Sequence, residues 1–120
     1  TAKRIHVKSS RVLVMGLAFK ENCPDLRNSK VADLVSELQK YGATVDVWDP
    51  WVSAKEARHE YGIKLVQKPA RNRYDGIVVA VGHRQFQAMK MAELRKLAKR
   101  NHVIYDIKYV FRRQETDGRL

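Results

Sequence analysis

The chain has 120 residues, and its 24 lysine and arginine residues against 13 aspartate and glutamate residues give a formal net charge of +11. A hydrophobic content of 44% with 31% charged residues is typical of a folded chain with one core, which excludes disordered and collagen-like proteins. The apolar stretches are far shorter than the roughly 20 residues that span a bilayer, so we do not expect an integral membrane protein.

The first half of the chain alternates strand and helix patterns. A short apolar run rich in β-branched residues at Val12–Met15, ended by Gly16, predicts a strand buried on both faces. Residues 19–27 are expected to form a loop. Either Asn28 or Ser29 can cap the helix that follows, whose apolar residues recur at helical spacing as far as Tyr41. Residues 44–48 alternate as a second strand.

The second half continues this alternation. Ser53 and Glu56 form a capping-box pattern for a helix that runs to about Tyr61 and ends at Gly62. Residues 64–66 predict a weak strand, and the basic connection after it leaves room for a short helix. Residues 76–81 predict a buried strand, residues 91–98 a helix and residues 102–105 a last strand, whereas the polar tail after Phe111 is expected to fray. The sequence therefore predicts an α/β domain of three layers, with a mostly parallel sheet and helices on both faces.

In an open parallel sheet, ligands bind beyond the carboxyl ends of the strands, so the loops that follow each strand are candidate binding walls. Lys20 and Lys108 follow the first and last strands and should lie at the same edge, where an ammonium group can bind phosphate or simply face solvent. Asp49 could bind a ribose, but the first turn has a single glycine instead of G-x-G-x-x-G. A turn-forming role beside Pro50 is therefore favoured for Asp49.

For the other polar residues, a role in supporting the loops is favoured over a role in catalysis or metal binding. Asp25 and Arg27 precede the first helix and are expected to brace the loop through an ion pair. His83, followed by Arg84, is the only histidine placed to touch a ligand, and the spacing of the four histidines does not predict a metal site. Cys23 has no base near it in sequence and is expected to be an ordinary thiol.

The sequence also indicates the cellular compartment of the protein. The single cysteine cannot form an internal disulfide, and the basic N-terminal residues are not followed by an apolar signal segment, which predicts a reducing, cytoplasmic setting. The first residue is Thr1, so we expect a processed chain or part of a longer one.

Trp48 and Trp51 are expected to pack against the sheet edge or a neighbouring chain.

Two segments of the sequence resemble the C-terminal domain of the UDP-glucose/GDP-mannose dehydrogenase family. They are residues 14–29, with the string G-L-A-F-K-E-N-C-P-D-L-R, and residues 41–50, and the late element Asp106-Ile107-Lys108 matches as well. The similarity extends over about residues 10–110. Within the family, the chain looks most like the branch that oxidises UDP-N-acetylhexosamines to uronic acids for bacterial surface polysaccharides.

The resemblance implies a Rossmann-like fold and a division of labour with other parts of a longer enzyme. It implies an N-terminal arm at residues 1–10 from the preceding inter-domain region, a UDP-sugar-binding C-terminal domain at residues 11–110, and a polar tail at residues 111–120. NAD, the catalytic cysteine and a central helical dimerisation region would belong to parts outside this chain. The isolated chain is accordingly expected to be inactive, and the full-length enzyme is expected to be a homodimer.

The resemblance also implies roles for particular residues. Phe19 and Lys20 look like the wall that contacts the nucleotide and its diphosphate. Lys108 stands where UDP-glucose enzymes often have arginine, which would weaken its diphosphate contact. His83 and Arg84 could reach toward the sugar. The alternative is a basic module that binds nucleic acid or another polyanion, suggested by the net charge but without a recognisable nucleic-acid motif.

Overall fold

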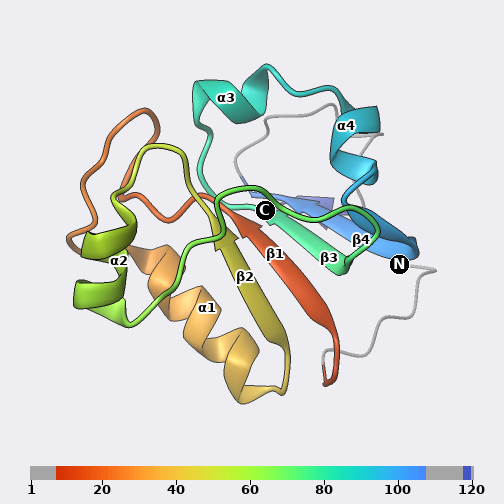
Figure 1. The fold of residues 1–120 in the computed structure, drawn as a ribbon, viewed down its shortest axis with the longest axis horizontal. Coiled ribbons are helices and arrows are strands. Elements are labelled where there is room, and N and C mark those ends of the chain that lie inside the picture. The colour runs from red at the N-terminus through yellow and green to blue at the C-terminus, as the bar shows by residue number, and fades with distance from the viewer. Residues whose placement is uncertain (1–7, 108–117, 120) are drawn as a thin grey trace.

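The computed structural model describes residues 8–107 and 118–119, which form a twisted parallel sheet flanked by helices (Figure 1). The strands are β1 (Arg11–Met15), β2 (Thr44–Trp48), β3 (Tyr74–Val79), β4 (Ala98–Asp106) and β5 (Gly118–Arg119), and the helices are α1 (Lys30–Lys40), α2 (Ala54–Tyr61), α3 (Arg84–Gln87) and α4 (Met91–Arg95). All neighbouring strands pair in parallel, in the order β2-β1-β3-β4-β5. The predicted fold class is confirmed.

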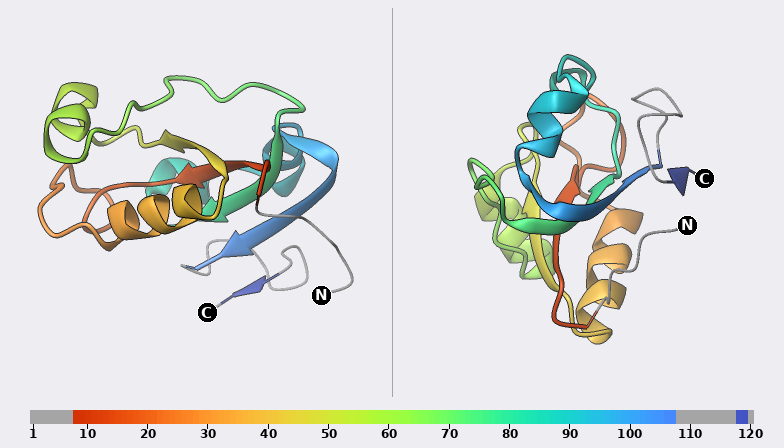
Figure 2. Two further views of the ribbon diagram at one scale, coloured as in Figure 1. Left: turned by 90° about the horizontal axis from the view of Figure 1, so that it is seen from below. Right: turned by 90° about the vertical axis from the view of Figure 1, so that its right-hand side faces the viewer.

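The strand β1 lies at the centre of two hydrophobic cores. Val12 and Val14 face the core that holds α1 and α2, whereas Leu13 and Met15 face the core that holds α3 and α4. Figure 2 shows α1 and the α3–α4 segment on opposite sides of the sheet. Because successive side chains of a strand point to opposite faces, only an uninterrupted apolar run could supply both cores, as the sequence of β1 predicts.

The predicted ends of the first helices are largely confirmed. Ser29 is the N-cap residue of α1, but its hydroxyl donates to the Leu17 carbonyl (2.6 Å) and makes no capping bond to the helix. The Ser53 hydroxyl accepts a hydrogen bond from the Glu56 N–H (3.3 Å), and Gly62 ends α2 in the left-handed conformation.

Five details of the sequence-based assignment are wrong. Residues 64–66 form only an isolated bridge between Leu65 and Val47, and the connection to β3 contains no helix. The helix that begins at Met91 ends at Arg95, because residues 98–101 already belong to β4. The short helix α3 was not predicted, and Tyr41 is 68% exposed instead of facing the core.

Residues 118–119 differ as well, since they form β5, which pairs with residues 105–106 of β4, whereas the sequence predicts fraying after Phe111. Trp48 packs against Phe86, with ring centroids 5.2 Å apart, in agreement with the expected packing on the sheet.

None of the helices in residues 8–107 is long and apolar enough to cross a membrane.

Gly16 allows β1 and the end of β3 to approach closely. Its φ of +102° is strained for other residues, and a Cβ atom there would lie 2.5 Å from Cβ of Val81. A side chain at position 16 would therefore push apart the two loops that leave the centre of the sheet.

We predict that Gly16→Ala lowers the free energy of unfolding by about 2–5 kcal/mol, because backbone strain and a steric clash add. Gly62→Ala is the matched control, since Gly62 also has a positive φ of +66° but a Cβ atom added there would meet no heavy atom within 4 Å beyond its chain neighbours. The control should lose only about 1–2 kcal/mol. Urea denaturation measures both, and equal losses would contradict the steric account.

Candidate functional site

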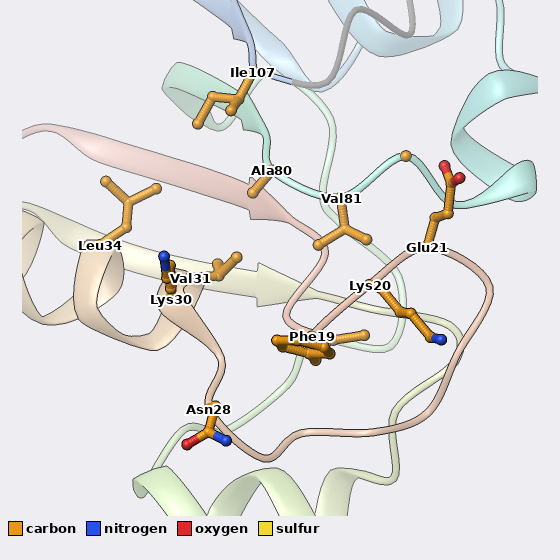
Figure 3. A pocket seen from close by; sticks show the side chains of 12 residues that line it. Phe19, Lys20, Glu21, Asn28, Lys30, Val31, Leu34, Ala80, Val81 and Ile107 are labelled. Atoms are coloured by element: carbon orange, nitrogen blue, oxygen red, sulfur yellow. The ribbon is translucent and has the colours of Figure 1, made fainter. Parts of the chain in front are cut away.

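A cavity of about 640 Å³ opens at the carboxyl edge of the sheet, between β1 and β3. The strand order reverses between these two strands, which is the place where open α/β sheets bind ligands. The loops after β1, β3 and β4 and the first turns of α1 form its wall (Figure 3). The lining residues are Ala18, Phe19, Lys20, Glu21, Asn28, Lys30, Val31, Leu34, Ala80, Val81, Gly82 and Ile107.

The cavity combines an apolar wall with basic groups. Val31, Leu34 and Ile107 contribute to the apolar wall, and Phe19 is 56% exposed, so its ring is available to a flat ligand. Lys20 and Lys30 are the cations of the lining. Because the N-terminus of α1 also faces this cavity, its backbone N–H groups add to the positive potential. The arrangement suits an anionic ligand that carries a planar or apolar group.

The loop after β1 is anchored on the buried carboxylate of Asp49, at the end of β2. Its Oδ2 accepts hydrogen bonds from the Leu17 N–H (2.7 Å) and the Ala18 N–H (2.9 Å), and its Oδ1 accepts one from the Trp51 N–H (2.7 Å). Burial opposes ionisation of Asp49, but these bonds, together with the bond from His83, bring its pKa below the usual value. The carboxylate therefore stays ionised inside the protein.

The imidazole of His83 links the same carboxylate to the far end of the loop. Its Nε2 lies 3.0 Å from Oδ2 of Asp49, and its Nδ1 accepts a hydrogen bond from the Asn22 N–H (2.9 Å). Since Nδ1 is an acceptor, the hydrogen-bond pattern assigns the ring proton to Nε2. Asn22 in turn accepts a hydrogen bond from the Arg84 N–H through its Oδ1 (2.8 Å).

Asp25 and Arg27 form the ion pair that the sequence predicts. Nε of Arg27 lies 3.3 Å from Oδ1 of Asp25, and hydrogen bonds from the Arg27 guanidinium hold the pKa of that carboxyl below its usual value. The Arg27 side chain is 84% exposed, so solvent screens the pair. A backbone bond from the Phe19 N–H to the Asp25 carbonyl (2.7 Å) braces the loop more directly, and the bracing role of the ion pair stays a prediction.

The structure brings some predicted site residues together and separates others. Phe19 and Lys20 both line the cavity, whereas Lys108 lies outside the described residues. The expectation that His83 touches a ligand is wrong, because its side chain is fully buried and both ring nitrogens are engaged. Arg84 is exposed and stacks over the ring of Trp51, 4.9 Å from its centroid, so its contact with a sugar stays a prediction.

Sequence reasoning missed Lys30 and the long-range contacts of Asp49. Lys30 stands in the first turn of α1, a position that the predicted helix start already placed beside the loop. Asp49 does form the expected turn through Trp51, but its bonds to Leu17 and Ala18 join segments far apart in the sequence, and local patterns do not reveal such contacts. In residues 8–107, no group of three metal-ligating side chains comes together.

Comparisons with known proteins agree with this geometry. A family model described as "UDP-glucose/GDP-mannose dehydrogenase family, UDP binding domain" matches residues 13–113. The UDP-N-acetyl-D-glucosamine 6-dehydrogenases of Pseudomonas aeruginosa and Salmonella typhi are 56% and 50% identical over 118 residues, which is 98% of this chain and 28% of each relative. The chain thus spans little more than a quarter of the length of these relatives.

Solved structures give the same result. The NDP-N-acetyl-D-galactosaminuronic acid dehydrogenase of Methanosarcina mazei matches 92% of this chain and 23% of its own, with a TM-score of 0.79 and 30% identity. A UDP-glucose dehydrogenase of Pyrobaculum islandicum matches 93% of this chain and 25% of its own, with a TM-score of 0.73 and 28% identity. The similarity in these proteins extends over one part of a longer chain.

We predict that Asp49→Asn lowers the free energy of unfolding by about 2–4 kcal/mol at pH 7, because charge-assisted hydrogen bonds to a buried carboxylate are lost. A carboxyl whose pKa is lowered by folding contributes stability above its unfolded pKa of about 3.9, and this contribution is lost as the pH falls below that value. The difference between variant and unaltered chain should therefore shrink below about pH 4.

Denaturation at several pH values from 7 to 3 measures this difference. The control is Asp25→Asn, whose exposed ion pair should change stability little. A gap between Asp49→Asn and the unaltered chain that stays constant over this pH range would show that the charge of Asp49 is not what stabilises the fold.

Proposed function

The chain belongs to the UDP-glucose/GDP-mannose dehydrogenase family, as its motifs predict, and from this membership we propose that its cavity binds the UDP portion of a nucleotide sugar. The longer enzyme would be an NAD-dependent UDP-N-acetylhexosamine 6-dehydrogenase that makes a UDP-hexosaminuronic acid for surface polysaccharide. The names of the relatives support this substrate class. The alternative of a basic module for nucleic acid is not favoured by these matches.

The proposal rests mainly on the residues that line the cavity of this chain, together with its membership of the family. A UDP-sugar offers two phosphates and a planar base. Lys20, Lys30 and the N-terminus of α1 provide positive potential for the diphosphate, and Phe19 provides an exposed ring for the planar group. Lys108 remains part of the proposed site because it directly follows Ile107, which lines the cavity.

The turn after β1 does not fit a dinucleotide. The carboxylate of Asp49, which would have to reach a ribose, is fully buried and occupied by backbone N–H groups and His83. The turn at Gly16 is filled by Val81, so a pyrophosphate has no room to approach its backbone. These contacts support the assignment of NAD to another part of the longer enzyme, and no catalytic step is assigned to residues of this chain.

The remaining parts of the proposal concern the longer enzyme. Residues 11–110 would form the UDP-sugar-binding domain, preceded by an inter-domain arm at residues 1–10 and followed by a tail at residues 111–120. The NAD-binding and central helical regions would complete the active site, and the enzyme would work as a cytoplasmic homodimer. Asp25 and Arg27 would brace the loop, and Arg84 would approach the sugar.

We predict that the 120-residue chain binds UDP, and that Lys20→Ala weakens this binding by about 1–3 kcal/mol, the usual contribution of a charged hydrogen bond. Lys40→Ala is the control, because Lys40 lies in the last turn of α1, away from the cavity. Titration calorimetry with UDP measures each affinity. Equal affinities for both variants would remove Lys20 from the site, and displacement of UDP by a random oligonucleotide would favour the polyanion alternative.

We also predict that the chain alone does not reduce NAD with any UDP-hexose. The half-buried Cys23 lies in the loop after β1, and in the family's motif its position is not that of the catalytic cysteine. Absorbance of the reduced nicotinamide during incubation with UDP-N-acetylglucosamine measures this activity. Steady NAD reduction by the purified chain that disappears in Cys23→Ser would contradict the proposed division of labour.

A further inference from the structure

Two polar residues next to the cavity, Asn22 and His83, do not line it, although their neighbours Glu21 and Gly82 do. Asn22 follows the ligand-facing part of the loop after β1, and His83 stands in the loop after β3. Figure 3 shows Glu21 directed toward the loop after β3, where the two loops come together. Contacts between Asn22 and His83 therefore form one boundary of the cavity.

The two loops are joined by a reciprocal pair of hydrogen bonds. The Asn22 N–H donates to Nδ1 of His83 (2.9 Å), and the Arg84 N–H donates to Oδ1 of Asn22 (2.8 Å). We call these residues (Asn22, His83 and Arg84) the clasp. Asn22 adopts a positive φ of 54°, a conformation that asparagine tolerates better than most residues. The local backbone strain is offset by the two bonds.

The orientation of the imidazole depends on Asp49. Its Oδ2 holds Nε2 of His83 at 3.0 Å, which keeps the proton on Nε2 and leaves Nδ1 as an acceptor for Asn22. The Asp49 and His83 side chains are both fully buried. The imidazole is shielded from water, whereas Asn22 and Arg84 are exposed, and Nδ1 can accept the Asn22 N–H only in this tautomer, so the clasp depends on it.

Both ends of the ligand-facing segment are thereby tied to one carboxylate. Leu17 and Ala18 bind Asp49 directly, and Asn22 binds it through His83. Residues 19–21, which include Phe19 and Lys20, lie between these two anchor points. A change at either anchor should alter where their side chains stand relative to the loop after β3.

We propose that Asn22 and His83 are positioning residues of the nucleotide site: the clasp fixes residues 19–21 against the loop after β3 and so determines the affinity for UDP. The inference rests on the proposed function for its ligand, but the ordering of the loop by the clasp does not require a ligand. Neither residue contacts the ligand in this account. Their effect on binding is transmitted through the backbone of the loop.

The sharpest test is Asn22→Gly, which keeps the positive φ available and removes the side chain whose oxygen accepts the Arg84 N–H. Asn72→Gly is a matched control, since Asn72 has a φ of 52° in an exposed turn before β3. Calorimetric titration with UDP should show a dissociation constant about fivefold higher for Asn22→Gly, as expected for one lost hydrogen bond, and an unchanged constant for Asn72→Gly.

Amide hydrogen exchange of the ligand-free chains separates positioning from a purely local role. If the clasp orders the segment, Asn22→Gly should speed exchange at Phe19 and at position 22 as well as at Arg84. Asn22→Asp, which retains an acceptor oxygen, should restore slow exchange. Faster exchange confined to Arg84, or an unchanged UDP affinity in Asn22→Gly, would overturn the proposal.

The two proposals fail in different ways. If the unaltered chain does not bind UDP, the proposed function is wrong and the clasp has no role in UDP affinity, while the exchange rates still decide whether it orders residues 19–21. If the unaltered chain binds UDP and Asn22→Gly binds it equally well, the proposed function stands and the positioning role is wrong.

Discussion

A single carboxylate, that of Asp49, connects the ends of three parallel strands. It lies beyond β2, accepts hydrogen bonds from the backbone that leaves β1, and holds the histidine that follows β3. A buried ion is costly unless its oxygen atoms are bonded, so the backbone of these loops must stay where it can donate. The requirement to satisfy one buried charge therefore shapes the edge of the sheet at which the cavity opens.

The rest of the site follows from the order of the strands. Because the chain crosses from β2 over β1 to β3, β1 leads to α1 on one face of the sheet and β3 leads to α3 on the other, and a crevice opens between the two connections. The close contact between Gly16 and Val81 closes the base of this crevice. The helix α1 then presents its first turn and Lys30 to the open side, which adds positive charge where the loops contribute Phe19 and Lys20.

Local patterns predicted the parts of this fold that depend on burial of apolar faces, and they failed where a segment is largely exposed. Residues 98–101 look unlike a strand because this part of β4 is largely exposed and needs no apolar alternation. The residues of the site were likewise predicted only in part. The position of Lys20 follows from the end of the strand before it. The connection of Asp49 to His83 joins residues 34 positions apart, which sequence spacing does not show.

The central claim is that UDP binds in the cavity between β1 and β3, and not on the basic surface elsewhere in the chain. Titration of the isotopically labelled chain with UDP, followed by backbone amide chemical shifts, tests it most directly. We expect saturable shifts concentrated at residues 18–21, 28–31 and 80–82, which line the cavity or adjoin its lining. Shifts that are spread over the basic residues 64–73 and 95–100, or that do not saturate, would contradict the claim.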